Sequence, residues 1–230
     1  MRLVWGPAYE LGILVIDQQH KRIVDYINDL DRLVGQPGAQ LGVARVLYDL
    51  VDYTGDEGNG GYDGVTVNLA KGFAIDGFGD RDELTSIEDV FGTIYNDKLV
   101  GDGGHDFLAG LEGRGPLIGG KGDDTLSGGE GNDSIEGGRG ADSLSGGRGH
   151  DWILGGNWRD TIDGGAAGDE LLGNRSEDLI YGGDGSDSLY GGSQSDTLLG
   201  GDRADTLEGG DGTDTLIDLD GLHYFFFCFS

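Results

Sequence analysis

Aspartate recurs at every ninth residue through the second half of this 230-residue chain, between short glycine-rich stretches. With Gly101 as position one, the register runs without insertion to Ile217 and defines thirteen nonapeptides. Carboxylate oxygens at a regular spacing, beside carbonyl oxygens left free by tight turns, are the hard ligands that calcium prefers and zinc does not. Position six is aspartate in twelve repeats, and these are the predicted calcium ligands: Asp106, Asp124, Asp133, Asp142, Asp151, Asp160, Asp169, Asp178, Asp187, Asp196, Asp205 and Asp214.

Glycine and a branched aliphatic residue occupy the other regular positions of the unit. Position one is glycine and position eight is leucine or isoleucine in all thirteen repeats. Because glycine permits positive φ, positions one to six are predicted to form a tight turn. Positions seven to nine are predicted to form a three-residue strand whose middle side chain points inward. The backbone carbonyls of the most complete turns are expected to add the strongest calcium ligands, at Gly119, Gly128, Gly137 and Gly146.

Two turns and two strands make one coil of eighteen residues, and the coils are expected to stack. Each strand then pairs with the equivalent strand of the next coil, and the aliphatic side chains line up inside. Aspartates eighteen residues apart lie above one another in two ladders on opposite edges, with a gap in one ladder at Gly115. A flexible linker is the alternative for so much glycine, but a linker has no reason to keep an aliphatic residue at every ninth position. The repeat therefore predicts a mainly β solenoid.

Composition limits the classes of partner. The 43 acidic and 15 basic residues give a formal net charge of −28, which disfavours nucleic acids and anionic membranes. No run of about 18 apolar residues is present, so no membrane span is predicted. The single cysteine, Cys228, excludes an internal disulfide. Because one aliphatic residue in nine buries little apolar surface while stacked carboxylates repel, we expect the repeat to be disordered until calcium binds.

The GGxGxD repeats and the preceding segment at residues 62–104 resemble the RTX (hemolysin-type calcium-binding) proteins. The resemblance implies a right-handed parallel β-roll, calcium bound between successive turns, and extracellular location after type I export. It favours a secreted calcium-dependent module of structural or adhesive role, while a remnant of a larger RTX toxin or hydrolase stays open. No HExxH or GxSxG motif is present, and no enzymatic activity is expected. The sequence identifies no protein or cell-surface partner.

Five residues replace glycine at position four and are expected to weaken their turns: Trp158, Ala167, Ser176, Gln194 and Arg203.

Apolar residues at helical spacing in the first 54 residues predict two helices, one ending near Val34 and a second containing Leu47, Leu50 and Val51. This segment resembles the first half of a bacteriohemerythrin, in which His20 would correspond to the first iron-binding histidine. Iron or oxygen binding is the alternative function. The other iron ligands of that family have no counterpart here, which counts against it. A two-helix hairpin leaves an apolar face uncovered, so these helices are expected to self-associate, to pack against the roll or to stay partly molten.

Four regions are expected from these patterns. Within the lead-in, Val65, Val67 and Leu69 predict a strand, and Leu84 to Val90 a short helical turn. The aromatic tail is expected to cover the last coil, to result from truncation, or to belong to a secretion signal. The regions are a hemerythrin-like helical fragment at 1–54, a lead-in and N-terminal cap at 55–100, the repeats at 101–217 and the tail at 218–230.

Overall fold

The fold is taken from a computed structural model, which describes residues 49–52, 64–77, 79, 81–218 and 224–226. The chain divides into two units, Met1–Leu47 and Tyr48–Ser230, and every described residue lies in the second. The first predicted helix and His20 therefore lie outside the described residues. The second unit is a β-solenoid of about seven turns.

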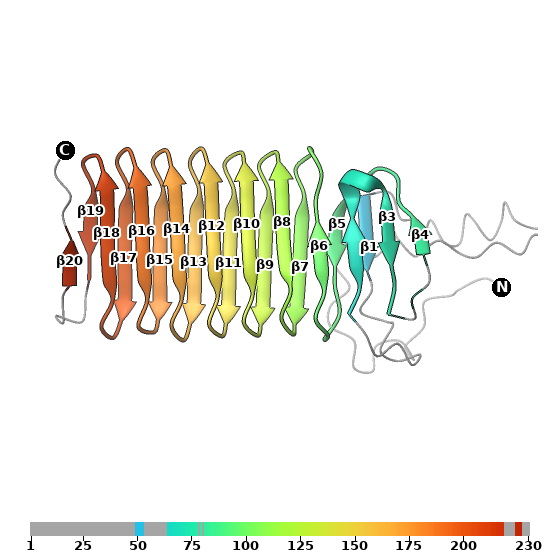
Figure 1. The fold of residues 1–230 in the computed structure, drawn as a ribbon, viewed down its shortest axis with the longest axis horizontal. Helices are drawn as coiled ribbons and strands as arrows, with labels where there is room; N and C mark the ends of the chain where they lie inside the picture. Colours follow the sequence, from blue (N-terminus) through green and yellow to red (C-terminus); the bar gives the residue numbers. More distant parts are fainter. Residues whose placement is uncertain (1–48, 53–63, 78, 80, 219–223, 227–230) are drawn as a thin grey trace, which may run out of the picture. The chain divides into compact units, whose positions relative to one another are not determined.

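From β5 onward, successive strands alternate between two sheets, as Figure 1 shows. The first sheet contains, in spatial order, β1 (Asp49–Asp52), β5 (Ile87–Phe91), β7 (Phe107–Glu112), β9 (Thr125–Glu130), β11 (Ser143–Arg148), β13 (Thr161–Ala166), β15 (Leu179–Asp184), β17 (Thr197–Asp202) and β19 (Thr215–Ile217). The second contains β20 (Tyr224–Phe226), β18 (Thr206–Asp211), β16 (Ser188–Ser193), β14 (Glu170–Arg175), β12 (Trp152–Asn157), β10 (Ser134–Arg139), β8 (Pro116–Lys121), β6 (Lys98–Val100), β2 (Thr66–Asn68), β3 (Phe73–Ile75) and β4 (Arg81–Glu83).

Strands of the repeat pair in parallel with a constant offset of eighteen residues, which confirms the predicted stacking. Ile135 of β10 pairs with Leu117 of β8 on one side and with Ile153 of β12 on the other. The turns join neighbouring coils as well, because the N–H of Thr125 donates to the carbonyl of Asp106 at 2.8 Å. Since backbone groups of each coil find partners in the next coil, no coil satisfies its own hydrogen bonds alone.

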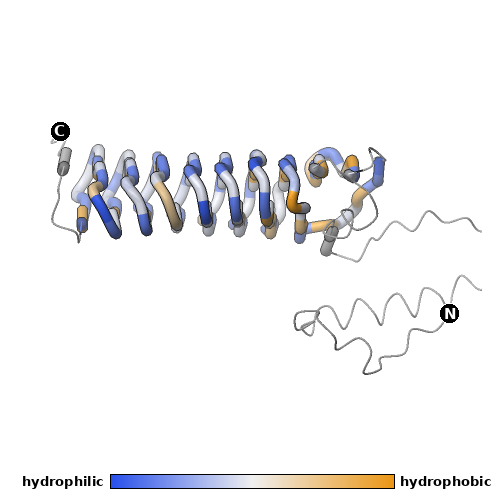
Figure 2. The backbone as a smooth tube through the Cα atoms, turned by 90° about the horizontal axis from the view of Figure 1, so that it is seen from below, coloured by the Kyte–Doolittle hydropathy of each residue, from blue (hydrophilic) through white to orange (hydrophobic). Residues whose placement is uncertain are grey.

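The core is a narrow row of aliphatic side chains between the two sheets. The position-eight residues from Leu108 to Leu207 are at most 2% exposed. The remaining positions are mostly polar or glycine, and Figure 2, in which the tube is coloured by residue hydropathy, shows that most residues of the coils are hydrophilic or neutral. Because hydrophobic stabilisation scales with the apolar area buried, one aliphatic residue per strand gives a small contribution for this length of chain.

From β7 to β18 the strands are six residues long, so the predicted three-residue strand and six-residue turn are wrong. Each of these strands begins at position seven of one unit and ends at position three of the next unit, as in Thr125–Glu130. The turn is reduced to positions four to six. Position one is left out of the strand pairing, because Glu136 pairs with Leu154 and the next pair is Gly138 with Gly156. Position two then has positive φ, 114° at Gly138, which only glycine adopts at little cost. The glycines therefore bend a strand rather than end it.

The lead-in extends the sheets beyond the first repeats. Val67 lies in β2, which pairs in parallel with β6 and antiparallel with β3, while Leu69 begins the 3₁₀ helix η3 (Leu69–Lys71). The helical turn predicted from Leu84 to Val90 is wrong, because β5 begins at Ile87 after Ser86, whose φ is 55°. The segment is extended because β5 pairs in parallel with β7, and Ile87 and Val90 are its buried residues.

Both ends of the described chain add strands to the solenoid. Residues 49–52 form β1, parallel to β5, so the predicted second helix does not include them. Main-chain hydrogen bonds to the edge of β5 favour the extended form of this segment. At the other end, Tyr224 of β20 pairs with Thr206 of β18, eighteen residues earlier, which continues the spacing of the repeat into the tail.

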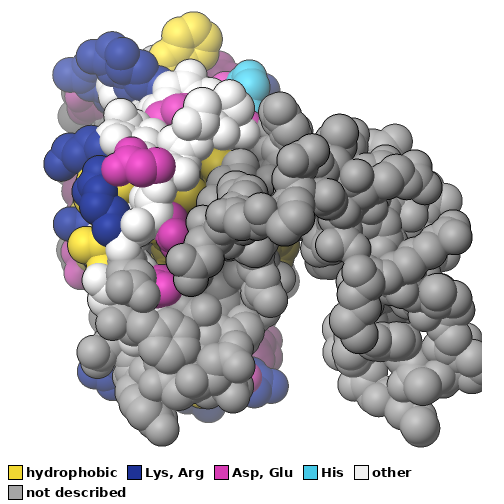
Figure 3. All heavy atoms as spheres, turned by 90° about the vertical axis from the view of Figure 1, so that its right-hand side faces the viewer, with side chains coloured by type: hydrophobic (Ala, Val, Ile, Leu, Met, Phe, Trp, Pro, Cys, Tyr) yellow, Lys and Arg dark blue, Asp and Glu magenta, His cyan; other side chains and the backbone are white. Residues whose placement is uncertain are grey.

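Charged side chains of both signs lie on the outside of the solenoid, as the view onto the lead-in end shows (Figure 3). Exposed ion pairs join equivalent positions of adjacent coils, including Arg148 with Glu130 at 2.9 Å and Arg159 with Glu177. Within the described ranges, no helix has the length and apolar character needed to cross a membrane.

Candidate metal sites

The position-six aspartates lie in the last position of each turn, directly before a strand, with their side chains directed inward. From Asp106 to Asp205 they are at most 6% exposed, although a carboxylate is normally found at the surface. From Asp106 to Asp196, the N–H of the aspartate donates to Oδ1 of the aspartate eighteen residues later, over 2.7–3.0 Å. These bonds form the two predicted ladders.

The second carboxylate oxygen of most of these aspartates is buried without a hydrogen-bond donor. Within the part of the chain that the structure describes, Oδ2 accepts no hydrogen bond in Asp124, Asp133, Asp142, Asp151, Asp160, Asp169, Asp178, Asp187 and Asp196. A buried, unpaired carboxylate oxygen is costly, and such groups in native proteins normally pair or coordinate metal ions. The row of oxygens is thus a set of ligand atoms in need of a positive partner.

The glycine at position one places a backbone carbonyl beside each of these oxygens. A Cβ built on Gly119 would lie 2.8 Å from the carbonyl oxygen of Gly137 and closer still to Oδ2 of Asp124. The same holds at Gly128, where the neighbours are Gly146 O at 2.7 Å and Asp133 Oδ2. Only glycine leaves room there, which explains its presence at position one of every repeat. The four glycines predicted to supply carbonyls, including Gly146, lie along these two rows of oxygens.

Burial dominates the electrostatics of the ladders. It raises the pKa of Asp160 from 3.8 to about 8, although the N–H of Asp142 lowers it, and repulsion from Asp142 and Asp178 adds to the rise. Burial likewise raises the pKa of Asp142 and Asp169 to about 7. Loss of hydration disfavours the charged form of each carboxyl, and only a proton or a cation compensates. At neutral pH, the ladders therefore favour cation binding.

The oxygen ligands suit a particular class of cation. Carboxylate and carbonyl oxygens in number, without a thiolate or imidazole cluster among the described residues, match calcium in preference to zinc or copper. A protein-family model of the RTX calcium-binding nonapeptide repeat matches residues 85–115, 118–153, 145–175, 163–198 and 190–217. The chain belongs to the RTX calcium-binding repeat family. Ca²⁺ is thus the ion of this RTX protein.

Comparison with curated proteins also finds similarity in the N-terminal region. A bacteriohemerythrin of Pseudomonas aeruginosa is 51% identical over 53 residues, which make up 23% of this chain and 33% of that protein. A bacteriohemerythrin of Stenotrophomonas maltophilia is 45% identical over the same proportions of both chains. The RTX protein therefore spans about a third of the length of the curated relatives it matches.

The regular ladder has two exceptions at its start. At Gly115 no carboxylate exists, and the N–H of this glycine reaches Oδ1 of Asp133 at 3.2 Å. One level above, Asp97 is buried but accepts hydrogen bonds from the N–H groups of Val65 and Thr93 and from the Thr93 hydroxyl. These hydrogen bonds join Val65, Thr93 and Asp97 within the lead-in.

The five non-glycine residues at position four have positive φ, as do most of the glycines at this position. Their φ values lie between 80° and 90°, an uncommon conformation for residues with a Cβ. At the glycine turns, a Cβ on Gly140 would clash with the carbonyl oxygen of Gly122 one coil earlier. The expected weakening of calcium binding by the five non-glycine residues stays a prediction. The residues are Trp158, Ala167, Ser176, Gln194 and Arg203.

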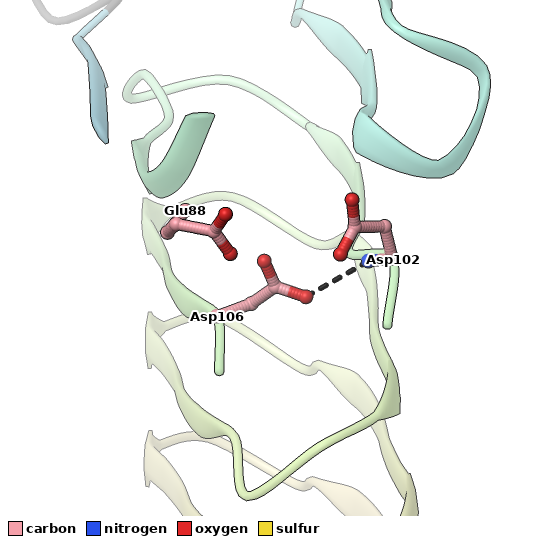
Figure 4. A group of neighbouring side chains, drawn as sticks. All are labelled: Glu88, Asp102 and Asp106. Atoms are coloured by element: carbon pink, nitrogen blue, oxygen red, sulfur yellow. Dashed lines mark hydrogen bonds between the residues drawn. The ribbon is translucent and has the colours of Figure 1, made fainter. Parts of the chain in front are cut away.

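Two further carboxylates were missed by the sequence reasoning. Glu88 and Asp102 lie with Asp106 in a group whose ligand atoms are all within 4.8 Å of one another (Figure 4). Glu88 stands in the lead-in, where no GGxGxD motif marks it, and Asp102 occupies position two, where glycine is usual. The available signal was the spacing, because Glu88 precedes Asp106 by eighteen residues.

Proposed function

We propose that the chain is a secreted, calcium-dependent folding module in which Ca²⁺ is held along both ladders by the position-six aspartates and position-one carbonyls. Its role is structural or adhesive rather than enzymatic. The observation that carries the proposal is the row of buried Oδ2 atoms without a hydrogen-bond donor among the described residues. The proposed ligands include Asp205 and Asp214, which accept hydrogen bonds from Asp187 and Asp196 as the rest of the ladder does.

Calcium binding and folding are coupled in this proposal. The coils bury one row of aliphatic side chains per sheet, while the coils between Asp124 and Asp196 also bury carboxylates with raised pKa values, such as Asp142 and Asp151. The bound ions replace the lost hydration of the carboxylates and relieve their mutual repulsion. Because the unfolded chain lacks the assembled site, binding free energy becomes folding free energy.

The coupling of folding to calcium binding also supports secretion. RTX repeats are typical of secreted proteins. A chain that stays unfolded where free calcium is scarce is suited to passage through a type I export channel, and calcium outside the cell then folds it. The net charge of −28 favours calcium capture and opposes association with nucleic acid.

Calorimetric titration of the full chain with calcium tests the proposal. Wild-type protein is expected to bind several ions with a gain of β-structure in circular dichroism. Asp142→Asn removes a buried ligand and is expected to bind fewer ions, because an amide oxygen carries no charge. Asp163→Asn makes the same change at an exposed strand position and serves as the control. Absence of calcium binding, or identical stoichiometry in both variants, contradicts the proposed ligands.

Iron binding by the first 54 residues is a second candidate, favoured by the similarity to bacteriohemerythrins. His20 would be a vestigial iron ligand, and it lies outside the described residues. Metal analysis of the purified full chain after growth with iron tests this candidate, with His20→Ala as the comparison. Stoichiometric iron in the wild type that is lost in the variant supports iron binding, and an iron-free wild type excludes it.

A further inference from the structure

The first coil differs from all later coils in the partners of its position-six aspartate. In the position-six aspartates from Asp124 to Asp196, Oδ1 accepts from the residue eighteen positions earlier and Oδ2 accepts no hydrogen bond from a described residue. In Asp106, Oδ2 instead accepts from the N–H of Asp102 at 2.8 Å. Its Oδ1 accepts no hydrogen bond from any described residue, although the side chain is only 2% exposed.

The unpaired oxygen of Asp106 points between two other carboxylates. Figure 4 shows Oδ1 directed into the space between the carboxylates of Glu88 and Asp102. The ligand atoms of the three residues lie within 4.8 Å of one another, a separation that a single ion can bridge. Asp106 is therefore a buried side chain that directs a free ligand atom into the group.

Each carboxylate is positioned by the fold. β5 and β7 pair in parallel with Asp89 opposite Phe107, so Glu88 lies one level above Asp106 at the edge of the same sheet. Asp102 follows β6, and its Oδ1 accepts a hydrogen bond from the N–H of Gly104 at 2.7 Å. Gly104 also leaves the room that the Glu88 carboxylate occupies, because a Cβ there would collide with Oε2 of Glu88.

Three carboxylates at this spacing repel strongly unless a cation lies among them. Burial raises the pKa of Asp106 to about 7, and repulsion from Asp124, Asp102 and Glu88 adds to the effect. We infer that Glu88, Asp102 and Asp106 form a further calcium site, which closes the open end of one ladder with side-chain ligands instead of a preceding glycine turn. The inference rests on the proposed function in one respect, namely that Ca²⁺ is the ion available to the ladders.

The site has a consequence for the order of binding. Ligand charge tunes calcium affinity, and this group offers three carboxylates from one small volume. The site therefore fills at a lower free calcium concentration than the internal turns. It also joins the lead-in to the first repeat, since Glu88 belongs to β5 and Asp106 precedes β7.

Anomalous diffraction from crystals of the full chain grown in calcium tests the site directly. The expected result is a calcium peak between the three carboxylates, in addition to peaks along the ladders. Glu88→Gln is expected to remove that peak and to lower the bound calcium, measured by elemental analysis after gel filtration, by one ion per chain. Glu112→Gln makes the same change at an exposed position of β7 and is expected to leave both measurements unaltered.

The outcomes separate this inference from the proposed function. Peaks along the ladders without one at Glu88, Asp102 and Asp106 overturn the additional site and leave the proposed function intact. Absence of calcium in both places overturns both. Circular dichroism in saturating calcium checks that Glu88→Gln folds, and Asp102→Asn, at a partly exposed turn position, provides the same test if it does not. Unchanged stoichiometry in a folded Glu88→Gln or Asp102→Asn variant also overturns the site.

Discussion

Acidification in excess EDTA is expected to fold the solenoid without calcium. The position-six carboxyls are buried in the coils, and burial raises the pKa of Asp160 to about 8 and of Asp178 to about 7 from 3.8. The folded, metal-free chain therefore holds protons that the unfolded chain releases above about pH 4. Because the folded state binds more protons, its stability is greatest below pH 4 and falls as the pH rises to about 8.

The size of this effect is large for each carboxyl. A rise in pKa from 3.8 to about 7, as in Asp142, Asp169 and Asp178, destabilises the metal-free coil by about 4 kcal/mol at pH 7.5, at 1.36 kcal/mol per unit. At pH 5 the corresponding cost is about 1.6 kcal/mol. Since whole domains are stable by about 5–15 kcal/mol, a few such carboxyls decide whether the metal-free solenoid folds.

Circular dichroism of the full chain in EDTA, recorded between pH 5 and pH 7.5, measures the transition. The β signal is expected at pH 5, to be lost toward pH 7.5, and to return at pH 7.5 when calcium is added. Asp160→Asn removes an ionisable group and is expected to move the midpoint to higher pH, whereas the exposed Asp163→Asn does not. A metal-free β signal that is independent of pH, or that increases with pH, refutes the reasoning.

Three further predictions concern the coil itself. Gly140→Ala introduces a Cβ that clashes with the carbonyl of Gly122 at a φ of 134°, so it is expected to raise the calcium concentration needed for folding. Ser134→Ala, at an exposed position of β10, is the control. Ile153→Ala, at a fully buried position, is expected to lower stability in saturating calcium by about 2–5 kcal/mol in urea unfolding, and a change below 1 kcal/mol contradicts the proposed core. Arg148→Ala breaks an exposed ion pair and is expected to change stability by less than about 1 kcal/mol in the same assay.

The sequence was sufficient to predict the stacking and the two ladders, because every part of them depends on one period. Position eight carries an aliphatic residue and position six an aspartate at constant spacing, and the structure pairs residues such as Leu144 and Ile162 eighteen apart. A period determines which residues lie above one another, whatever the local backbone conformation. Calcium as the ion followed from the same oxygen-rich pattern and is confirmed by the family match.

The strand length could not be predicted from local propensity. Glycines at positions one and two favour a turn in isolation, yet Gly128 and Gly129 lie inside β9 because neighbouring coils offer hydrogen-bond partners on both sides. Tertiary pairing overrides the intrinsic preference of glycine here. The strand β5 was missed for a related reason, since its pairing with β7 lies outside any local window.

The Glu88 group was missed because its members come from three different contexts. Asp106 belongs to the repeat pattern, Asp102 departs from it, and Glu88 precedes it. Only the parallel pairing of β5 with β7 brings the lead-in residue above the first repeat. A search restricted to the motif cannot find a ligand that the fold supplies from outside the motif.

The offset of eighteen residues between paired strands limits how this solenoid changes length. Insertion or loss of one nonapeptide transfers every later strand to the opposite sheet and reverses the side on which the chain leaves the last coil. Insertion or loss of two nonapeptides adds or removes a whole level and leaves both ends oriented as before. Duplication in pairs is therefore the neutral route of growth for this architecture, and an odd change redirects whatever is attached beyond β19.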